Sequence, residues 1–185
     1  MLILPILEEK ELVKQLQSSA EKEAAFRTLM QLYKERLYWH IRKIVISHDD
    51  ADDVLQNTFI KVFKSIGNFK GDSKLYSWMY RIATNEAITH INKNAKRNHL
   101  TSEEFQMQLV NNLQADVYFE GNEIQVKLQK AIAALPQKQQ LVFNMKYFDN
   151  MKYKDMSEVL ETSEGALKAS YHLAVKKIEA ILTRD

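Results

Sequence analysis

The chain has 185 residues, 45% of them hydrophobic, and a formal net charge of +2, with no cysteine, 4 glycines and 2 prolines. The lack of cysteine excludes a disulfide scaffold, a thiolate metal site and a thiol nucleophile. Because so few glycines and prolines leave little to mark turns between strands, the composition predicts an all-α fold of long helices. The apolar start "MLILPIL" has no positive flank and is too short for a membrane span, so we expect a soluble cytoplasmic protein.

Charges are segregated along the chain. Residues 61–98 hold eight Lys or Arg and two acids, whereas residues 100–123 hold five acids and no Lys or Arg. The basic block predicts a polyanion partner. The acidic block shows weak periodicity, as expected of a linker. These observations divide the chain into an N-terminal domain at 1–98, a flexible acidic linker at 99–123 and a C-terminal domain at 124–185.

The first domain opens with apolar residues at helical spacing up to residue 45, after which "SHDDADD" interrupts the pattern. His and Asp in this segment suit a metal, but Asp49 and Asp50 equally suit the N-cap and first turn of a helix, and we prefer that interpretation. The following helix, at about 51–66, is expected to bury Leu55, Phe59, Val62, Phe63 and Ile66. Its opposite face carries Ile60, which indicates either a docking surface or one stray exposed isoleucine.

Residues 68–97 combine a loop, aromatic rings and a basic end. The loop Phe69–Lys74 contains Gly71 and precedes the rings of Tyr76, Trp78 and Tyr80. At 100° per residue, a polar stripe then runs between two apolar stripes of the same helix, and consists of Arg81, Asn85, Thr89 and Asn92. Such a stripe suits contacts to a nucleic-acid backbone and base edges. Any single ring fits a core, but loop, rings and basic tail together favour a site for unpaired bases, where stacking contributes about 1–3 kcal/mol per base.

The C-terminal domain follows the helix-turn-helix plan of short helix, tight turn and longer helix. Helices are expected at 137–148, with Phe148 inward, and at 153–160, and Ser163 is expected to N-cap the last helix. One face of that helix is apolar. The opposite face suits phosphates, thymine methyls and a base edge, and carries Lys168, Ala169, His172, Leu173 and Lys176. The alternative is a three-helix bundle with a solvated face.

In this order the two motifs resemble bacterial RNA polymerase sigma factors of the sigma-70 family, extracytoplasmic-function (ECF) type. "DDADDVLQNTFIKVFKSIGNFKGDSKLYSWMYRIATNEAITHI" resembles the family's second region, and "LPQKQQLVFNMKYFDNMKYKDMSEVLETSEGALKASYHLAVKKI" resembles its fourth. The resemblance implies a protein without catalysis, metal or cofactor that binds core RNA polymerase, recognises promoter elements and directs transcription initiation. An anti-sigma factor is a further expected partner, and no membrane insertion is expected.

The resemblance also implies residue roles. One set would dock on the clamp helices of the polymerase beta-prime subunit: Asp52, Asp53, Gln56, Asn57, Ile60 and Lys64. The beta flap of the polymerase is a further expected partner, without assigned residues. A second set would bind the minus-ten element, its loop holding a flipped base: Phe69, Lys70, Gly71, Asp72, Ser73, Lys74, Tyr76, Arg81, Asn85, Thr89, Asn92, Lys93, Lys96 and Arg97. The last helix would read the minus-thirty-five element through Lys168, Ala169, His172, Leu173 and Lys176.

Some positions depart from the family pattern. Asn57 stands where an acid is usual, and Ser170, Leu173 and Val175 stand where arginine is frequent. The segment "KASYHLAVKKIE" resembles sigma factors of Bacteroidetes. A helix-turn-helix regulator that is not a sigma subunit is the alternative, but it leaves residues 68–97 unexplained. An enzyme is disfavoured because the five histidines are scattered and no nucleotide-binding loop occurs.

Overall fold

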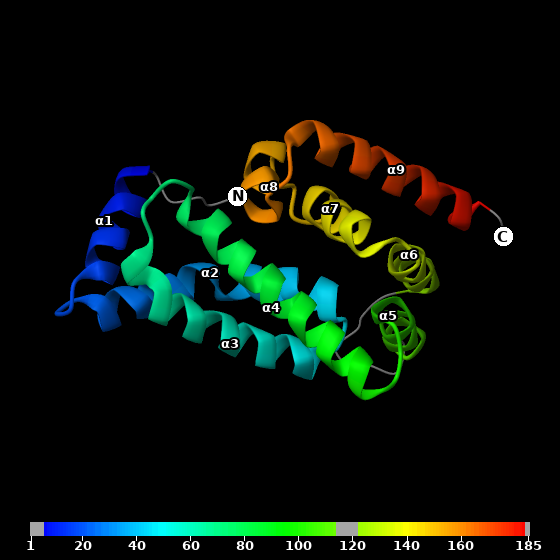
Figure 1. The fold of residues 1–185 in the computed structure, drawn as a ribbon, viewed down its shortest axis with the longest axis horizontal. Helices are drawn as coiled ribbons and strands as arrows, with labels where there is room; N and C mark the ends of the chain where they lie inside the picture. Colours follow the sequence, from blue (N-terminus) through cyan, green and yellow to red (C-terminus); the bar gives the residue numbers. More distant parts are fainter. Residues whose placement is uncertain (1–5, 114–121, 184–185) are drawn as a thin grey trace.

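The computed structural model describes residues 6–113 and 122–183, and within these ranges every regular element is helical, which confirms the all-α prediction (Figure 1). The elements are α1 (Ile6–Gln17), α2 (Lys22–Val45), α3 (His48–Ser65), the 3-10 turn η1 (Ile66–Asn68), α4 (Leu75–Arg97), α5 (Ser102–Asn111), α6 (Glu123–Ala133), α7 (Gln137–Tyr147), α8 (Tyr153–Leu160) and α9 (Glu164–Leu182).

The N-terminal half is a bundle in which α4 packs against both α2 and α3, and α1 covers one end (Figure 1). Its interior is apolar, with Leu29, Ile41 and Met79 fully buried. The start of α3 differs from expectation. Ser47 is the N-cap, and its hydroxyl accepts a hydrogen bond from the Asp50 amide at 3.4 Å. Asp49 therefore lies in the first turn, where its charge suits the helix dipole.

The C-terminal half contains the expected helix-turn-helix in α8 and α9. Glu161 ends α8 in the left-handed conformation, and Ser163 caps α9 by accepting from the Ala166 amide, as predicted. The prediction that Phe148 points inward is wrong. Helix α7 ends one residue earlier, and the Phe148 side chain remains 37% exposed.

The prediction of a flexible linker over 99–123 is wrong for its first part, because residues 102–111 form α5. Thr101 and Glu104 form a capping box that starts this helix, and Phe105 and Val110 are buried beneath it. The Gln106 side chain donates to the Ile44 carbonyl at 3.0 Å. The part of the expected linker at 114–121 lies outside the described residues.

The two halves share one hydrophobic core, because Met145, Met156 and Leu167 belong to the same buried cluster as α2, α3 and α4. A polar node joins them at Asp149. Its carboxylate contacts His40 Nδ1 at 3.1 Å and the Lys43 ammonium, and His40 Nε2 lies 2.8 Å from the Thr84 hydroxyl. Burial raises the pKa of Asp149, but the contacts with His40 and Lys43 outweigh it and hold that pKa below its ordinary value.

This node predicts a defined pH dependence of stability. Because the folded-state pKa of Asp149 is lowered, its stabilisation is present above the ordinary carboxyl pKa and is lost as the pH falls through the lowered one. Asp149→Asn should therefore reduce the free energy of unfolding by about 1–3 kcal/mol at pH 7, and the difference should shrink towards pH 3. Urea unfolding at several pH values measures this. Glu179→Gln, at an exposed acid of α9, is the control and should change little at either pH.

Candidate nucleic-acid interface

The loop before α4 is positioned by α1. The Gln17 side chain donates to the carbonyls of Ile66 at 3.1 Å and Phe69 at 2.8 Å, and the Glu9 carboxylate accepts from the Leu75 amide at 3.0 Å. Gly71 has φ +80°, a conformation that favours glycine. Three contacts from one helix and a glycine turn thus set the shape of the loop.

Hollows lie on both sides of this loop. One, of about 500 Å³, lies between the loop, α1 and α8, and a smaller one of about 170 Å³ lies between the loop, Trp78 and Arg81. Phe69 is only 8% exposed, and its ring packs 5.2 Å from that of Trp78. Lys70 and Asp72 are exposed instead. The loop therefore presents its charged and polar groups, while its aromatic ring belongs largely to the core.

The polar stripe lies along one face of α4 as the helical spacing predicts. Asn85, Thr89 and Asn92 are exposed, and the Thr89 hydroxyl donates to the Asn85 carbonyl at 2.7 Å. The Asn92 side chain accepts from the Ser102 hydroxyl at 2.7 Å, which joins the stripe to the start of α5. The basic end is also exposed, at Lys93, Lys96 and Arg97.

The beginning of the same helix lies under α8 (Figure 1). The Lys74 ammonium is 2.7 Å from the Asp155 carboxylate, and Arg81 Nη1 is 2.9 Å from that of Glu161. Tyr76 is only 6% exposed. Burial and the neighbouring Asp155 raise the pKa of its hydroxyl. The structure thus separates the expected minus-ten residues into a set that does not contact the C-terminal half and a set that does, although Lys74 and Arg81 in the second set remain 40% and 36% exposed.

The face of α9 that is expected to read DNA is exposed. Lys168, Ala169, His172, Leu173 and Lys176 are all exposed, whereas Leu167, Ala174 and Ile178 on the other side are buried. The Lys168 ammonium lies 5.6 Å from the centre of the Tyr153 ring, within range of a weak cation–π contact. Nothing in the described part of the chain covers this face.

The third expected surface borders an apolar groove of about 470 Å³ between α2 and α3. Gln56, Ile60 and Lys64 line it on the α3 side, and Phe26 and Met30 on the α2 side. Ile60 is 50% exposed. Asp53 and Asn57 are exposed and Asp52 is partly so. An exposed isoleucine beside an apolar groove is typical of a protein-docking surface rather than of a stray side chain.

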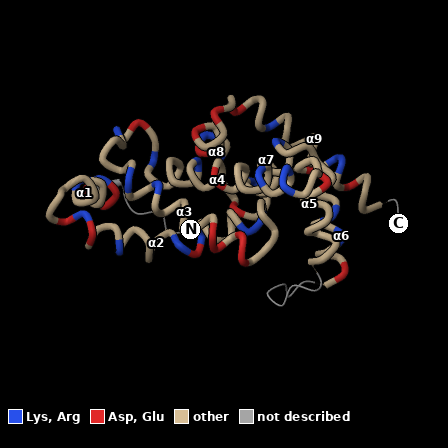
Figure 2. Tube along the Cα trace, turned by 60° about the horizontal axis from the view of Figure 1, so that its bottom comes forward, with Lys and Arg blue, Asp and Glu red and all other residues tan. Residues whose placement is uncertain are grey.

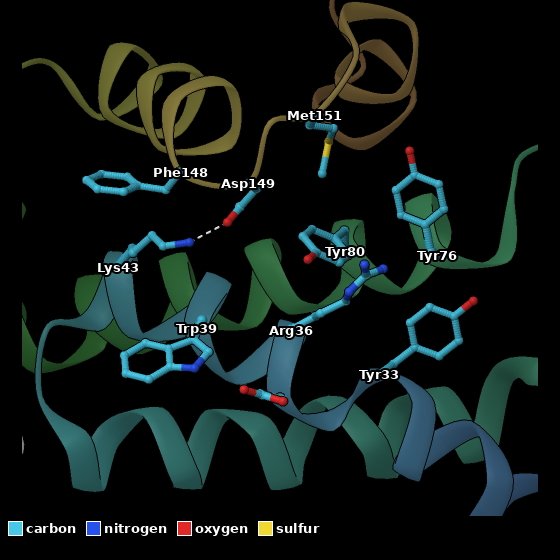
Figure 3. Close-up of a pocket in the computed structure, with 10 residues that line it drawn as sticks. Tyr33, Arg36, Trp39, Lys43, Tyr76, Tyr80, Phe148, Asp149 and Met151 are labelled. Atoms are coloured by element: carbon cyan, nitrogen blue, oxygen red, sulfur yellow. Dashed lines mark hydrogen bonds and ion pairs between the residues drawn. The ribbon is translucent and has the colours of Figure 1, made fainter. Parts of the chain in front are cut away.

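A cavity of about 520 Å³ between the two halves has no counterpart in the sequence analysis (Figure 3). Its walls come from α2, from α4 and from the loop after α7, and the lining residues are Tyr33, Glu35, Arg36, Trp39, Lys43, Tyr76, Tyr80, Phe148, Asp149 and Met151. Burial and the charge of Glu9 raise the pKa of Tyr33 to about 12. No local pattern indicates this cavity, because its walls lie about a hundred residues apart in the sequence.

Among the described helices, none is long and apolar enough to cross a membrane.

Sequence comparison identifies the two halves. The family model described as "Sigma-70 region 2" matches residues 29–97, and the model described as "Sigma-70, region 4" matches residues 125–178, about two thirds of the chain together. The chain belongs to the sigma-70 family. It is an ECF-type RNA polymerase sigma factor, and therefore a transcription initiation factor rather than an enzyme.

Curated relatives agree with this membership over nearly the whole length. The chain is 26% identical to RNA polymerase sigma-H factor of Pseudomonas aeruginosa, over 95% of this chain and 94% of that protein. It is 27% identical to ECF RNA polymerase sigma factor SigW of Bacillus subtilis, over 80% of this chain and 83% of that protein.

Two solved structures share the fold of this sigma factor. The structure of CnrH in complex with the cytosolic domain of CnrY matches with a TM-score of 0.70 at 20% sequence identity. The match covers 96% of this chain and 98% of the matched chain. The structure of the sigma factor RpoE in complex with the anti-sigma factor NepR, from Bartonella quintana, matches with a TM-score of 0.65 at 19% sequence identity. The match covers 86% of this chain and 98% of the matched chain.

The open α9 face predicts a separation between specificity and general affinity. His172→Ala should relax the preference at one base pair of the promoter, worth about 1–3 kcal/mol of discrimination. Lys176→Ala or Lys168→Ala should instead weaken binding to all sequences and flatten its dependence on log salt by about one unit. Holoenzyme binding to a library of upstream elements at several salt concentrations measures both quantities. A change of base preference in Lys176→Ala but not in His172→Ala would contradict this assignment.

Proposed function

We propose that this sigma factor uses three separate surfaces during initiation: the α3 face for core polymerase, the loop and α4 stripe for the minus-ten element, and the α9 face for the minus-thirty-five element. The observation that carries the proposal is that an exposed polar stripe on α4 and an exposed recognition face on α9 lie in the two regions matched by the family models. Binding to the polymerase and reading of the promoter then depend on different residues.

The minus-ten role rests on the arrangement around the loop. The small hollow between the loop, Trp78 and Arg81 offers a place for one unpaired base, and Asn85 and Thr89 lie beyond it along the helix. Extracting a base costs a few kcal/mol of stacking and pairing, and one stacking site returns about 1–3 kcal/mol of that. A single pocket therefore nearly offsets the cost for one base, so strand opening should require a well-matched promoter.

The docking role rests on the groove beside α3. Its apolar floor and exposed rim at Gln56, Ile60 and Lys64 suit a helical partner such as the clamp helices of the beta-prime subunit. Asn57 lacks the charge that is usual in the family, so this contact depends more on the groove than on an ion pair. The beta flap is the proposed partner of the C-terminal half.

We also propose an anti-sigma partner, because RpoE is held by an anti-sigma factor in its solved complex and CnrH by the cytosolic domain of another protein. The last helix supports assignment to a Bacteroidetes-like subgroup through "KASYHLAVKKIE". The proposed place of action of this sigma factor is the cytoplasm, where RNA polymerase works.

Strand opening can be tested with exposed residues. Alanine at Phe69 or Tyr76 would also remove buried packing, at a cost of several kcal/mol, so the variant is Lys70→Ala/Asn85→Ala/Thr89→Ala. Holoenzyme with this variant should open a duplex promoter at least about tenfold less, equivalent to about 1.4 kcal/mol, as measured by permanganate reactivity of thymines. A promoter already mismatched over the minus-ten region should restore activity.

The matched control for strand opening is Arg27→Ala/Thr28→Ala/Gln31→Ala, which removes three exposed side chains of similar type from α2. It should open the duplex normally. Normal thymine reactivity with the α4 variant would show that the stripe does not act in opening.

Core docking is tested by Ile60→Asp. A charge beside the apolar groove should weaken capture of core polymerase at least about tenfold, about 1.4 kcal/mol, in a pulldown at moderate salt. Ile124→Asp is the control, since Ile124 is 73% exposed on α6 and does not line the groove. Equal loss in both variants, or none in Ile60→Asp, would contradict the assignment of the α3 face.

A further inference from the structure

Helix α4 begins without a capping side chain of its own. Its N-cap residue is Lys74, whose side chain makes no capping hydrogen bond, and its first turn contains no acid. The amide of Leu75, the first helical residue, donates instead to the Glu9 carboxylate of α1 at 3.0 Å. The first amides of a helix need acceptors from outside the helix, and a negative charge there suits the helix dipole. Glu9 therefore supplies the cap that the local sequence lacks.

The other end of the loop before α4 is held by the same helix. Ile66 begins the 3-10 turn η1 and Phe69 follows that turn. The Gln17 side-chain amide donates to the carbonyls of both, at 3.1 and 2.8 Å. Helix α1 therefore holds the backbone on either side of residues 70–74, and Figure 1 shows the loop running beside it. We call these three hydrogen bonds the α1–loop contact.

Apolar residues fix α1 behind the loop. Leu12 and Leu16 are buried in the same cluster as Leu75, at the start of α4. Glu9 and Gln17 lie about two helical turns apart, and both line the hollow of about 500 Å³ beside the loop. Packing of the apolar side of α1 on the bundle thus places the two polar side chains at the loop backbone.

The charges of α1 do not suit direct binding of phosphates. The helix carries three acids and two lysines, so both signs lie along it (Figure 2). A surface that binds the backbone of DNA directly is expected to be basic. Any contribution of α1 to promoter binding is therefore expected to act through the loop that it holds.

We infer that Glu9 and Gln17 are positioning residues for strand opening, because the α1–loop contact holds the loop in the shape that accepts an unpaired base. The inference rests on the proposed role of the loop and α4 in minus-ten binding. A base that enters an ordered loop does not have to order it, so more of the stacking free energy remains to oppose pairing. The same shape selects which base fits, so the contact also sets the base preference at that position.

The test compares two double variants in holoenzyme. Glu9→Ala/Gln17→Ala removes the α1–loop contact. The control, Glu8→Ala/Gln15→Ala, removes the same types of side chain and the same charge from α1. Glu8 is exposed, and the Gln15 side chain donates to Glu11 within the helix at 3.5 Å. Permanganate reactivity of minus-ten thymines on a duplex promoter should fall about tenfold in the first variant, equivalent to about 1.4 kcal/mol, and should be near wild type in the control.

Two further measurements separate positioning from a loss of folding. The first uses four promoters that are mismatched over the minus-ten region and differ in the base at the position that wild type discriminates most strongly. Glu9→Ala/Gln17→Ala should transcribe the four more equally than wild type, whereas a merely unstable protein would lose activity on all four alike. The second uses Glu9→Gln, whose amide oxygen can still accept from Leu75. This variant should open the duplex better than Glu9→Ala.

Normal opening by Glu9→Ala/Gln17→Ala would overturn the inference, and so would a base preference equal to that of wild type or an equal loss on all four mismatched promoters. The proposed function is tested separately by Lys70→Ala/Asn85→Ala/Thr89→Ala. Normal opening by that triple variant would reject the proposed minus-ten role itself. A defect in the triple variant, together with normal opening by Glu9→Ala/Gln17→Ala, would reject the positioning role alone.

Discussion

The structure depends on the double burial of α4. This helix packs against α2 and α3 and also meets α8, and ten of its 23 residues are buried. A helix with two buried sides has room for only one narrow polar stripe, and Asn85, Thr89 and Asn92, which we propose contact nucleic acid, lie on it. The same constraint places the loop before α4 at the boundary between the two halves.

Helical periodicity was sufficient to predict the parts of the fold that depend on neighbouring residues. The helix-turn-helix, its Ser163 cap, the stripe on α4 and the exposed Ile60 all follow from spacings of three or four residues and from capping preferences. Periodicity also separates the buried face of α9 from its exposed face.

Contacts between distant segments could not be predicted in this way. The cluster of His40, Thr84 and Asp149 joins three elements whose sequences give no sign of one another. Phe69 and Tyr76 were interpreted as rings displayed to bases, yet tertiary packing buries both. Helix α5 was missed because its composition resembles a linker, while its stability comes from burial of Phe105 and Val110 against the rest of the chain.

The supports of the loop before α4 lie in α1, which precedes the stretch matched by the region 2 model. Glu9 and Gln17 hold the backbone of the loop without belonging to the surface proposed to meet DNA. A substitution at either position changes the shape of the loop without altering any residue that is proposed to contact DNA. Divergence between related factors can therefore proceed through the amino-terminal helix, at positions that an inspection of the recognition residues alone would overlook.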